Sequence, residues 1–384
     1  MKITNFLKSE SLSGIVLIVC VIVSLIIANS PGGTAFQNVL DFKIAGLSIL
    51  NWINDGLMAI FFFLIGLEIK HEMLDGHLST FKKAAVPVFA AVGGALVPAA
   101  IYACFNIGTP GAKGWGIPMA TDIAFALGVL SLLGKIVPPA LKAFLSALAV
   151  VDDLLAIIVI AIFYAAEIHW LYLAIAAGIF VLLLLMNKLG VKRAFYFIIP
   201  GIIMWYFIHH SGVHATVAGV LTALAVPNKA KNGSPLQKLA HGLTKPVNYI
   251  IMPLFALANT DIRFTSEMLE GVGGVLSLGI IIGLVAGKPL GVMLASWLSV
   301  KTKIGKLPDG FARKHILGIG LLAGIGFTMS IFMSFLSFGN STQDAQSKLA
   351  IMLASLIAGS SGYVYLKNKL SVKAKPKIPV ASKG

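Results

Sequence analysis

Two adjacent aspartates, Asp152 and Asp153, stand inside an apolar run that extends from about residue 143 to residue 165. A run of this length can span the hydrocarbon core of a bilayer as one helix. Two central carboxylates cost about 5–7 kcal/mol of insertion free energy, which roughly cancels the gain of about 4–8 kcal/mol from the apolar residues. We therefore expect this helix to rely on neighbouring helices, water or cations, and an acid at this depth usually has a functional role.

The adjacent positions of the two aspartates determine what they can do together. On a helix their side chains point about 100° apart, so one can face a water-filled cavity while the other faces a neighbouring helix. Carboxylates this close release their protons in coupled steps, and their oxygens are hard ligands for a small hard cation. The pair predicts a site where protons exchange against a metal cation. The alternative is a structural pair, buried against a lysine or backbone groups.

Three further polar residues lie in apolar segments: Thr121 and Asp122 in GWGIPMATDIAFALG, and Lys288 in GLVAGKPLG. If the helix is broken beside Asp122, this carboxylate can compensate the positive N-terminus of a half-helix or join the ion site. A purely structural cap is the alternative. Lys288 can neutralise one of the aspartates or carry a proton itself. Otherwise it extends its side chain to the membrane surface.

Four titratable residues fall near the ends of predicted spans. Glu68 and Glu72, one turn apart, either line an acidic funnel that collects cations or are solvated interface charges. Asp55, at the other end of the same span, is better explained as an interfacial charge. His214 has a side chain that titrates near neutral pH, so it is a candidate for pH response, although a lone histidine is more often structural.

The composition predicts an all-α polytopic membrane protein, because 58% of the 384 residues are hydrophobic, 12% are charged, and long apolar runs recur. It argues against a soluble enzyme and, despite the net charge of +15, against nucleic-acid binding. The chain 1–384 is expected to form one membrane domain. We predict twelve spans, at about 12–29, 52–69, 84–105, 115–133, 139–165, 169–187, 194–210, 212–227, 246–260, 273–299, 315–337 and 348–366.

Lysine and arginine are distributed unevenly between the loops. They gather at the N-terminus, in the even-numbered loops and in the C-terminal tail, whereas the odd-numbered loops hold only Lys43, Lys113, Arg263 and Lys348. By the positive-inside rule, both termini are cytoplasmic. The same basic surface is expected to attract anionic membrane lipids, which accounts for the net charge without nucleic acid.

Segments outside the spans carry weaker signals. The outer loop 30–50 combines β-compatible residues with a glycine break, which indicates a small β-hairpin outside the membrane. The tail 367–384 is rich in Lys, Pro and Ser, which is typical of a disordered basic segment. Cys20 and Cys104 both fall in apolar runs, so a disulfide or a cysteine-based metal site is not expected.

Spans four and eleven are interrupted. Pro118 and Gly116 precede Thr121 and Asp122 in the first, and several glycines precede Thr328 in the second. Each is the middle member of a set of three spans, 3–5 and 10–12. Each set has an odd number of spans, and the two sets start on opposite sides of the membrane, so they have inverted topology. Broken helices at matching positions of inverted repeats indicate the binding site of a secondary transporter.

Six segments carry specific motifs: ATDIAFALG (120–128), AVVDDLLAI (149–157), SGVHATVAG (211–219), GKPLG (287–291), WINDGLMA and GIGFTMSIF. They resemble the NhaA-type bacterial sodium/proton antiporters, and the similarity runs from about residue 11 to residue 367. The resemblance implies a core bundle of about 84–165 and 273–366, in which the extended chains of spans 4 and 11 cross. It also implies an interface part of about 12–83 and 166–272, and a homodimer to which the hairpin contributes.

The resemblance also assigns roles to individual residues. It implies that Asp152 and Asp153 bind the cation and protons, that Asp122 and Lys288 are charge partners at the crossing, and that Glu68 lies near a cytoplasmic funnel. Because the chain keeps Asp152 and Lys288, it resembles the electrogenic members. It departs from the family at Ala240, where members can carry a glutamate linked to pH response.

The resulting hypothesis is a transporter of the bacterial inner membrane that is not an enzyme and has no cofactor. Protons moving inward drive Na⁺, and also Li⁺, out of the cytoplasm, and transport rises with pH because protons and cation compete. Two alternatives stay open. One is a sodium-coupled symporter of similar fold. The other is an intramembrane aspartyl protease that uses Asp122 and Asp153.

Overall fold

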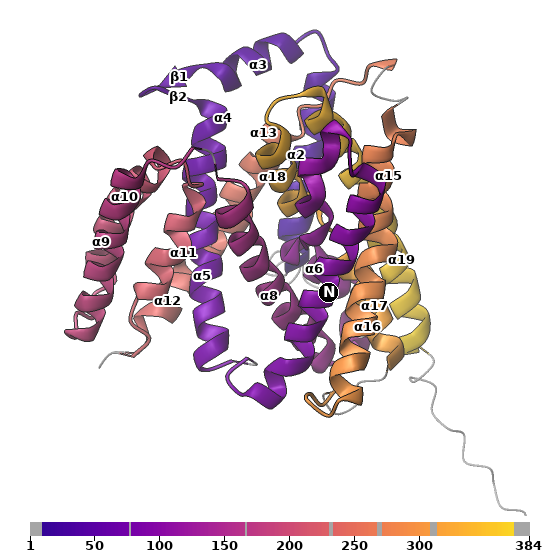
Figure 1. Ribbon diagram of the computed structural model, residues 1–384. Coiled ribbons are helices and arrows are strands. Elements are labelled where there is room, and N and C mark those ends of the chain that lie inside the picture. The colour runs from indigo at the N-terminus through magenta and orange to yellow at the C-terminus, as the bar shows by residue number, and fades with distance from the viewer. Residues whose placement is uncertain are drawn as a thin grey trace, which may run out of the picture.

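The computed structural model describes residues 10–76, 78–165, 167–229, 233–266, 271–307 and 313–371. Within these ranges each of the twelve predicted spans falls on a helix or on a bent helix pair. Six described helices are long and apolar enough to cross a membrane, or up to nine if each bent pair is one span. The all-α architecture expected from the sequence is confirmed (Figure 1).

The first half of the chain contains α2 (Glu10–Ala28), α3 (Gly33–Asp41), β1 (Lys43–Ile44), β2 (Leu47–Ser48), α4 (Ile49–Asn51), η1 (Trp52–Leu57), α5 (Met58–Leu74), α6 (Phe81–Asn106), η2 (Pro110–Met119), α7 (Ile123–Leu132), η3 (Gly134–Ile136), α8 (Pro139–Phe163) and α9 (Trp170–Lys188). The second half contains α10 (Phe195–His210), α11 (Thr216–Ala225), α12 (Pro235–Pro246), η4 (Val247–Ile251), α13 (Met252–Asn259), η5 (Gly271–Gly273), α15 (Val275–Ile282), η6 (Gly283–Gly287), α16 (Lys288–Lys301), α17 (Arg313–Ala323), α18 (Phe327–Phe338) and α19 (Thr342–Ser371).

The ninth and twelfth spans extend beyond their predicted ranges by more than a turn. The ninth span begins at Pro235, because α12 continues through η4 into α13. Since α12 is polar, a search for long apolar runs does not detect it. The twelfth begins at Thr342 and continues to Ser371, so helix extends into the first residues of the predicted tail. Residues 372–384 of that tail lie outside the described ranges.

The predicted hairpin is present as β1 and β2, an antiparallel pair with Lys43 opposite Ser48 and Ile44 opposite Leu47. The indole Nε1 of Trp52 donates a hydrogen bond of 2.9 Å to the carbonyl oxygen of Ile44, which fixes the hairpin to the start of η1. In Figure 1 the hairpin and α3 lie together at one end of the molecule, which we call the hairpin end.

Both predicted helix interruptions are present. The axes of η2 and α7 differ by 46°, and those of α17 and α18 by 48°. Between them, residues 120–122 and 324–326 leave the helical conformation, and the two extended chains meet where the Asp122 N–H donates to the Ile325 carbonyl, at 2.7 Å. This contact brings the ends of four half-helices, η2, α7, α17 and α18, close together.

Glycine contacts draw two pairs of helices very close. A Cβ on Gly291 of α16 would lie 2.1 Å from the Gly93 carbonyl oxygen of α6, and a Cβ on Gly219 of α11 would lie 2.2 Å from the Ala59 carbonyl oxygen of α5. Neither position accepts a larger residue without movement of backbone. Lys70 strengthens the second pair, because its Nζ donates to the carbonyl oxygens of Leu224 and Val226 at 2.5 and 2.6 Å.

The middle of the molecule is packed solidly on its hairpin side. The ring centroid of Phe332 in α18 lies 5.7 Å from that of Phe62 in α5 and 6.1 Å from that of Phe255 in α13. Nearer the hairpin, Asn54 and Asn259 exchange side-chain hydrogen bonds of 2.7 and 3.2 Å. These contacts join α5, α13 and α18 above the aspartate pair.

Candidate functional site

Helix α8 carries both aspartates into the centre of the molecule, where Asp152 is 2% exposed and Asp153 is 1% exposed. The helix spans 25 residues from Pro139 to Phe163 and presents a nearly continuous buried face around these positions. The crossing of the broken spans and the start of α16 lie beside it, so side chains from all three regions reach the carboxylates.

Asp152 belongs to a hydrogen-bonded network. Its Oδ2 atom accepts from the Lys288 ammonium, with which it forms a fully buried ion pair, and from the Thr121 hydroxyl at 2.5 Å. Lys288 also donates to the Met119 carbonyl oxygen at the end of η2. The prediction that Lys288 neutralises a span-five aspartate agrees with this geometry, and the alternative of a lysine extended to the surface does not. Its side chain is 0% exposed.

Thr121 has one hydroxyl hydrogen and two acceptors within reach. Its Oγ1 atom lies 2.5 Å from Asp152 Oδ2 and 2.8 Å from the carbonyl oxygen of Ala323, the last residue of α17. A single hydrogen serves only one acceptor well at a time. When Asp152 is protonated it can donate to Thr121, which then donates to Ala323. When Asp152 is ionised, the two oxygens compete for the Thr121 hydrogen.

Asp153 has very different surroundings. Neither of its carboxylate oxygens accepts a hydrogen bond from the described part of the chain, although both are buried. The side chain lines a cavity of about 500 Å³. The same cavity is lined by Thr121, Asp122 and Thr328 at the crossing, and it extends along α5 past Glu68 and Glu72 toward the end opposite the hairpin. Asp153 is therefore the carboxylate that a cation entering this cavity meets unpaired.

Asp122 serves both broken helices at once. Its Oδ1 atom accepts the Phe125 N–H of α7 at 3.0 Å, and its Oδ2 atom accepts the Thr328 N–H of α18 at 3.1 Å as well as the Thr328 hydroxyl. Half-helix N-termini carry partial positive charge, which a carboxylate stabilises. The cap and the charge-compensation hypotheses therefore describe the same arrangement.

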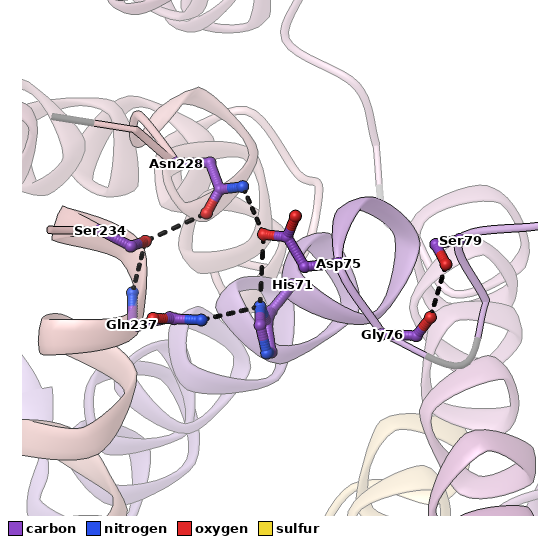
Figure 2. Close-up of polar contacts among 7 residues, drawn as sticks. All are labelled: His71, Asp75, Gly76, Ser79, Asn228, Ser234 and Gln237. Atoms are coloured by element: carbon purple, nitrogen blue, oxygen red, sulfur yellow. Dashed lines mark hydrogen bonds and ion pairs between the residues drawn. The ribbon is translucent and has the colours of Figure 1, made fainter.

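The mouth of the cavity is bordered by polar contacts between α5 and α12 (Figure 2). His71 Nδ1 lies 3.9 Å from Asp75 Oδ2 and 3.5 Å from the Gln237 amide nitrogen. Asn228 donates to Asp75 at 2.7 Å, and Ser234 donates to Asn228 at 3.0 Å. The end of α5 is thus connected to the chain that precedes α12.

The structure separates residues that the sequence grouped as funnel or pH-response candidates. Glu68, Glu72 and Ala240 line the cavity, together with His71 and His241, which sequence reasoning did not single out. A signal for His71 was available, because it lies three residues after Glu68 and therefore on nearly the same face of one helix.

His214 lies elsewhere, at the hairpin end, and does not line this cavity. Its Nε2 atom is 2.9 Å from the Tyr164 carbonyl oxygen, just after α8, so Nε2 carries a hydrogen and donates. Tyr164 in turn donates to the Lys113 carbonyl oxygen at 2.9 Å and so connects α8 to η2.

Within the described ranges, no cluster of three or more His, Cys, Asp or Glu side chains is arranged to hold a metal ion. At the crossing the cavity is lined by Asp122, Asp153 and Thr121, so oxygen-bearing side chains are reached from one side. Helices interrupted in the membrane, with an ionisable centre at their crossing, define an ion-coupled secondary transporter.

Comparison with known proteins identifies the family. The sequence profile described as Na+/H+ antiporter 1 matches residues 4–366. The Na⁺/H⁺ antiporter NhaA 2 of Flavobacterium johnsoniae is 58% identical over 380 residues, which cover 95% of this chain and 93% of that protein. The NhaA antiporter of Dechloromonas aromatica is 51% identical over 368 residues, covering 94% and 95%. The chain belongs to the Na⁺/H⁺ antiporter 1 family, as its motifs predicted.

Proposed function

We propose that this chain is an electrogenic Na⁺/H⁺ antiporter that exports Na⁺, and also Li⁺, in exchange for more than one proton. Family membership supports the exchange of Na⁺ for H⁺. The observation that supports the site is the contrast between Asp153, unpaired on the cavity, and Asp152, bound to Lys288 and Thr121. Neither family membership nor this contrast supports the sodium-coupled symporter or the intramembrane aspartyl protease.

The stoichiometry follows from counting charges. In the proton-loaded state Asp153 is neutral, and ionised Asp152 balances protonated Lys288. When Na⁺ binds between the two carboxylates, Asp153 loses its proton and Asp152 exchanges Lys288 for the cation. A lysine left without its counter-ion in a buried site loses its proton readily. Two protons then leave for each Na⁺ that binds, so one net charge moves in each cycle.

The direction of transport depends on the sidedness of the cavity. The positive-inside rule assigns the end opposite the hairpin, where the basic loops lie, to the cytoplasm. The cavity then receives Na⁺ from the cytoplasm, and Phe62, Phe255 and Phe332 close the path to the exterior. Alternating access requires the core, about 84–165 and 273–366, to move against the remaining spans. We place the protein in the bacterial inner membrane, as a homodimer in contact with anionic lipids.

Substitution of Asp153 by Asn tests this function. In proteoliposomes with a pH-sensitive dye, wild-type protein is expected to move protons when Na⁺ is added, and Asp153→Asn is expected to abolish this flux because an amide neither releases a proton nor attracts a cation. Asp41→Asn, in the exposed α3, is the matched control and should retain wild-type flux. Normal Na⁺-driven flux in Asp153→Asn would refute the assignment of the site.

A further inference from the structure

Helix α18 starts at the crossing, and its first N–H groups have no acceptor within the helix. Gly326, at the N-cap position, has no side chain to supply one. Two side chains from other helices accept instead. Asp122 accepts the Thr328 N–H, and the Ser355 hydroxyl of α19 accepts the Phe327 N–H at 3.2 Å. Ser355 is 9% exposed, so solvent does not replace it readily.

We infer that Ser355 is a positioning residue of the ion site, which holds the start of α18 so that Asp122 and Thr328 keep their places at the crossing. This inference rests on the proposed antiport function. Ser355 does not touch the cation path itself, since it is absent from the cavity lining. It acts through the half-helix that it caps.

The face of α19 that contacts the break between α17 and α18 explains how the Ser355 hydroxyl reaches the Phe327 N–H. Ala354 and Ala358 are fully buried, and a Cβ on Gly324 would lie 3.2 Å from the Ala358 Cβ. A Cβ on Gly359 would lie 3.3 Å from the Ile325 side chain. Small residues at these positions let the helix axis approach the extended chain closely, and this contact brings the short Ser355 side chain within hydrogen-bond distance of a backbone N–H.

Loss of the Ser355 hydroxyl would leave the Phe327 N–H without this acceptor in a buried position, which is unfavourable. Asp122 is the acceptor of the next amide N–H along the chain, that of Thr328, and it also accepts from the Phe125 N–H and the Thr328 hydroxyl. Drawing its carboxylate toward Phe327 would weaken the cap of α7. Thr121 directly precedes Asp122, so a shift of Asp122 would also displace the Thr121 hydroxyl from Asp152. We therefore expect weaker Na⁺ binding in addition to any effect on folding.

The test compares Ser355→Ala, Ser355→Thr and Ser361→Ala in proteoliposomes, as Na⁺-dependent proton flux between pH 6.5 and 8.5. Ser361 is a matched control on the same helix, because its hydroxyl only donates to the Ala358 carbonyl of its own turn, at 3.0 Å. Ser355→Ala is expected to raise the KM for Na⁺ about 3- to 10-fold, the range that follows from typical values for loss of a helix cap. Its pH profile should shift to more alkaline values, while Ser355→Thr and Ser361→Ala retain wild-type values.

Hydrogen–deuterium exchange of peptides covering residues 324–332 gives a readout that does not depend on transport. Faster exchange there in Ser355→Ala, but not in Ser361→Ala, is expected. If Ser355→Ala does not fold, Ser355→Cys preserves the side-chain size with a weaker acceptor and should show the same changes in smaller degree. An unchanged KM for Na⁺ and unchanged hydrogen–deuterium exchange in a folded Ser355→Ala variant would overturn the inference. Absence of Na⁺-driven proton flux in the wild type would instead overturn the proposed antiport function.

Discussion

The two sides of α8 differ more than their adjacent aspartates suggest. On one side Asp152 is held by Lys288 and Thr121, within a network that reaches Met119 and Ala323. On the other side Asp153 faces a cavity with no hydrogen bond from the described residues. Two identical side chains on consecutive residues therefore have different hydrogen-bonding surroundings, because a rotation of about 100° places them on different sides of the helix.

Under the proposed mechanism, the difference explains how one Na⁺ can displace two protons, one from Asp153 and one from Lys288. A paired carboxylate is ionised with its counter-ion, so it gives up a partner when Na⁺ arrives. An unpaired buried carboxylate is most stable when neutral, so it gives up a proton. Substitutions that change the surroundings of one aspartate and leave those of the other unchanged therefore test this contrast.

The largest expected effect is on stability. Asp152→Asn leaves Lys288 without its counter-ion and is expected to lower the free energy of unfolding by about 3–5 kcal/mol, the usual cost of breaking a buried pair. Asp153→Asn removes an unpaired buried carboxylate and should leave stability unchanged or higher. Thermal unfolding in detergent measures both. Restoration of stability by adding Lys288→Gln to Asp152→Asn would confirm the pair, and equal unfolding temperatures for the two single variants would contradict the contrast.

The next effect concerns pH. Protons occupy the site at low pH and leave as pH rises, so the KM for Na⁺ should fall with rising pH. With two protons displaced per Na⁺, the limiting slope is about 100-fold per pH unit, and with one it is about tenfold. The double variant Asp152→Asn with Lys288→Gln should reduce the slope to the smaller value, because it removes both members of the buried pair and only the proton on Asp153 remains to compete. Initial rates against Na⁺ concentration at several pH values give the slope, and a KM independent of pH in wild type would exclude competition.

A smaller effect is expected from Thr121→Val, which keeps the side-chain shape but removes the hydroxyl. Asp152 and the Ala323 carbonyl each lose their shared donor. Hydrogen bonds to charged groups contribute about 1.5–3 kcal/mol, so a rise of about 10- to 100-fold in the KM for Na⁺ is expected. Thr121→Ser, which retains the hydroxyl, should recover most of the affinity. Equal KM values for the Val and Ser variants would show that only the packing of Thr121 matters.

The smallest effect is expected at the cavity wall. Glu68→Gln removes a negative charge that attracts cations toward Asp153 without touching either aspartate in a hydrogen bond. A rise of about 2- to 3-fold in the KM for Na⁺ at low ionic strength is expected, and it should shrink as choline chloride screens the cavity. A salt-independent loss of transport would instead place Glu68 among the groups that carry protons.

Much of the architecture follows from local sequence. Glycine and proline before Asp122 and Thr328 predicted the two breaks, and β-compatible residues around Gly46 predicted the hairpin. The extension of the ninth span to Pro235 escaped prediction, because a helix with one polar face shows no apolar run. The limits of such local patterns are clearest within the site.

The sequence pointed to the residues of the proposed site but not to their arrangement. Adjacent positions fix the angle between Asp152 and Asp153, whereas the rotation of α8 against its neighbours decides which one faces the cavity. That rotation depends on packing between distant segments, as does the contact of Ser355 with Phe327. The position of the Thr121 hydroxyl between Asp152 and the Ala323 carbonyl also depends on the crossing of two distant segments, which no local pattern encodes.

The contact between Gly219 and Ala59 has a mechanical consequence. Because backbone lies against backbone here, and Lys70 joins the end of α11 to α5, we expect these two helices to move together. A movement of α5 that narrows the mouth beside Glu72 must therefore displace the segment before α11, where His214 donates to the carbonyl that ends the aspartate helix. The two ends of the molecule are thereby linked through one contact. A methyl group added at Gly219 would force α5 and α11 apart there.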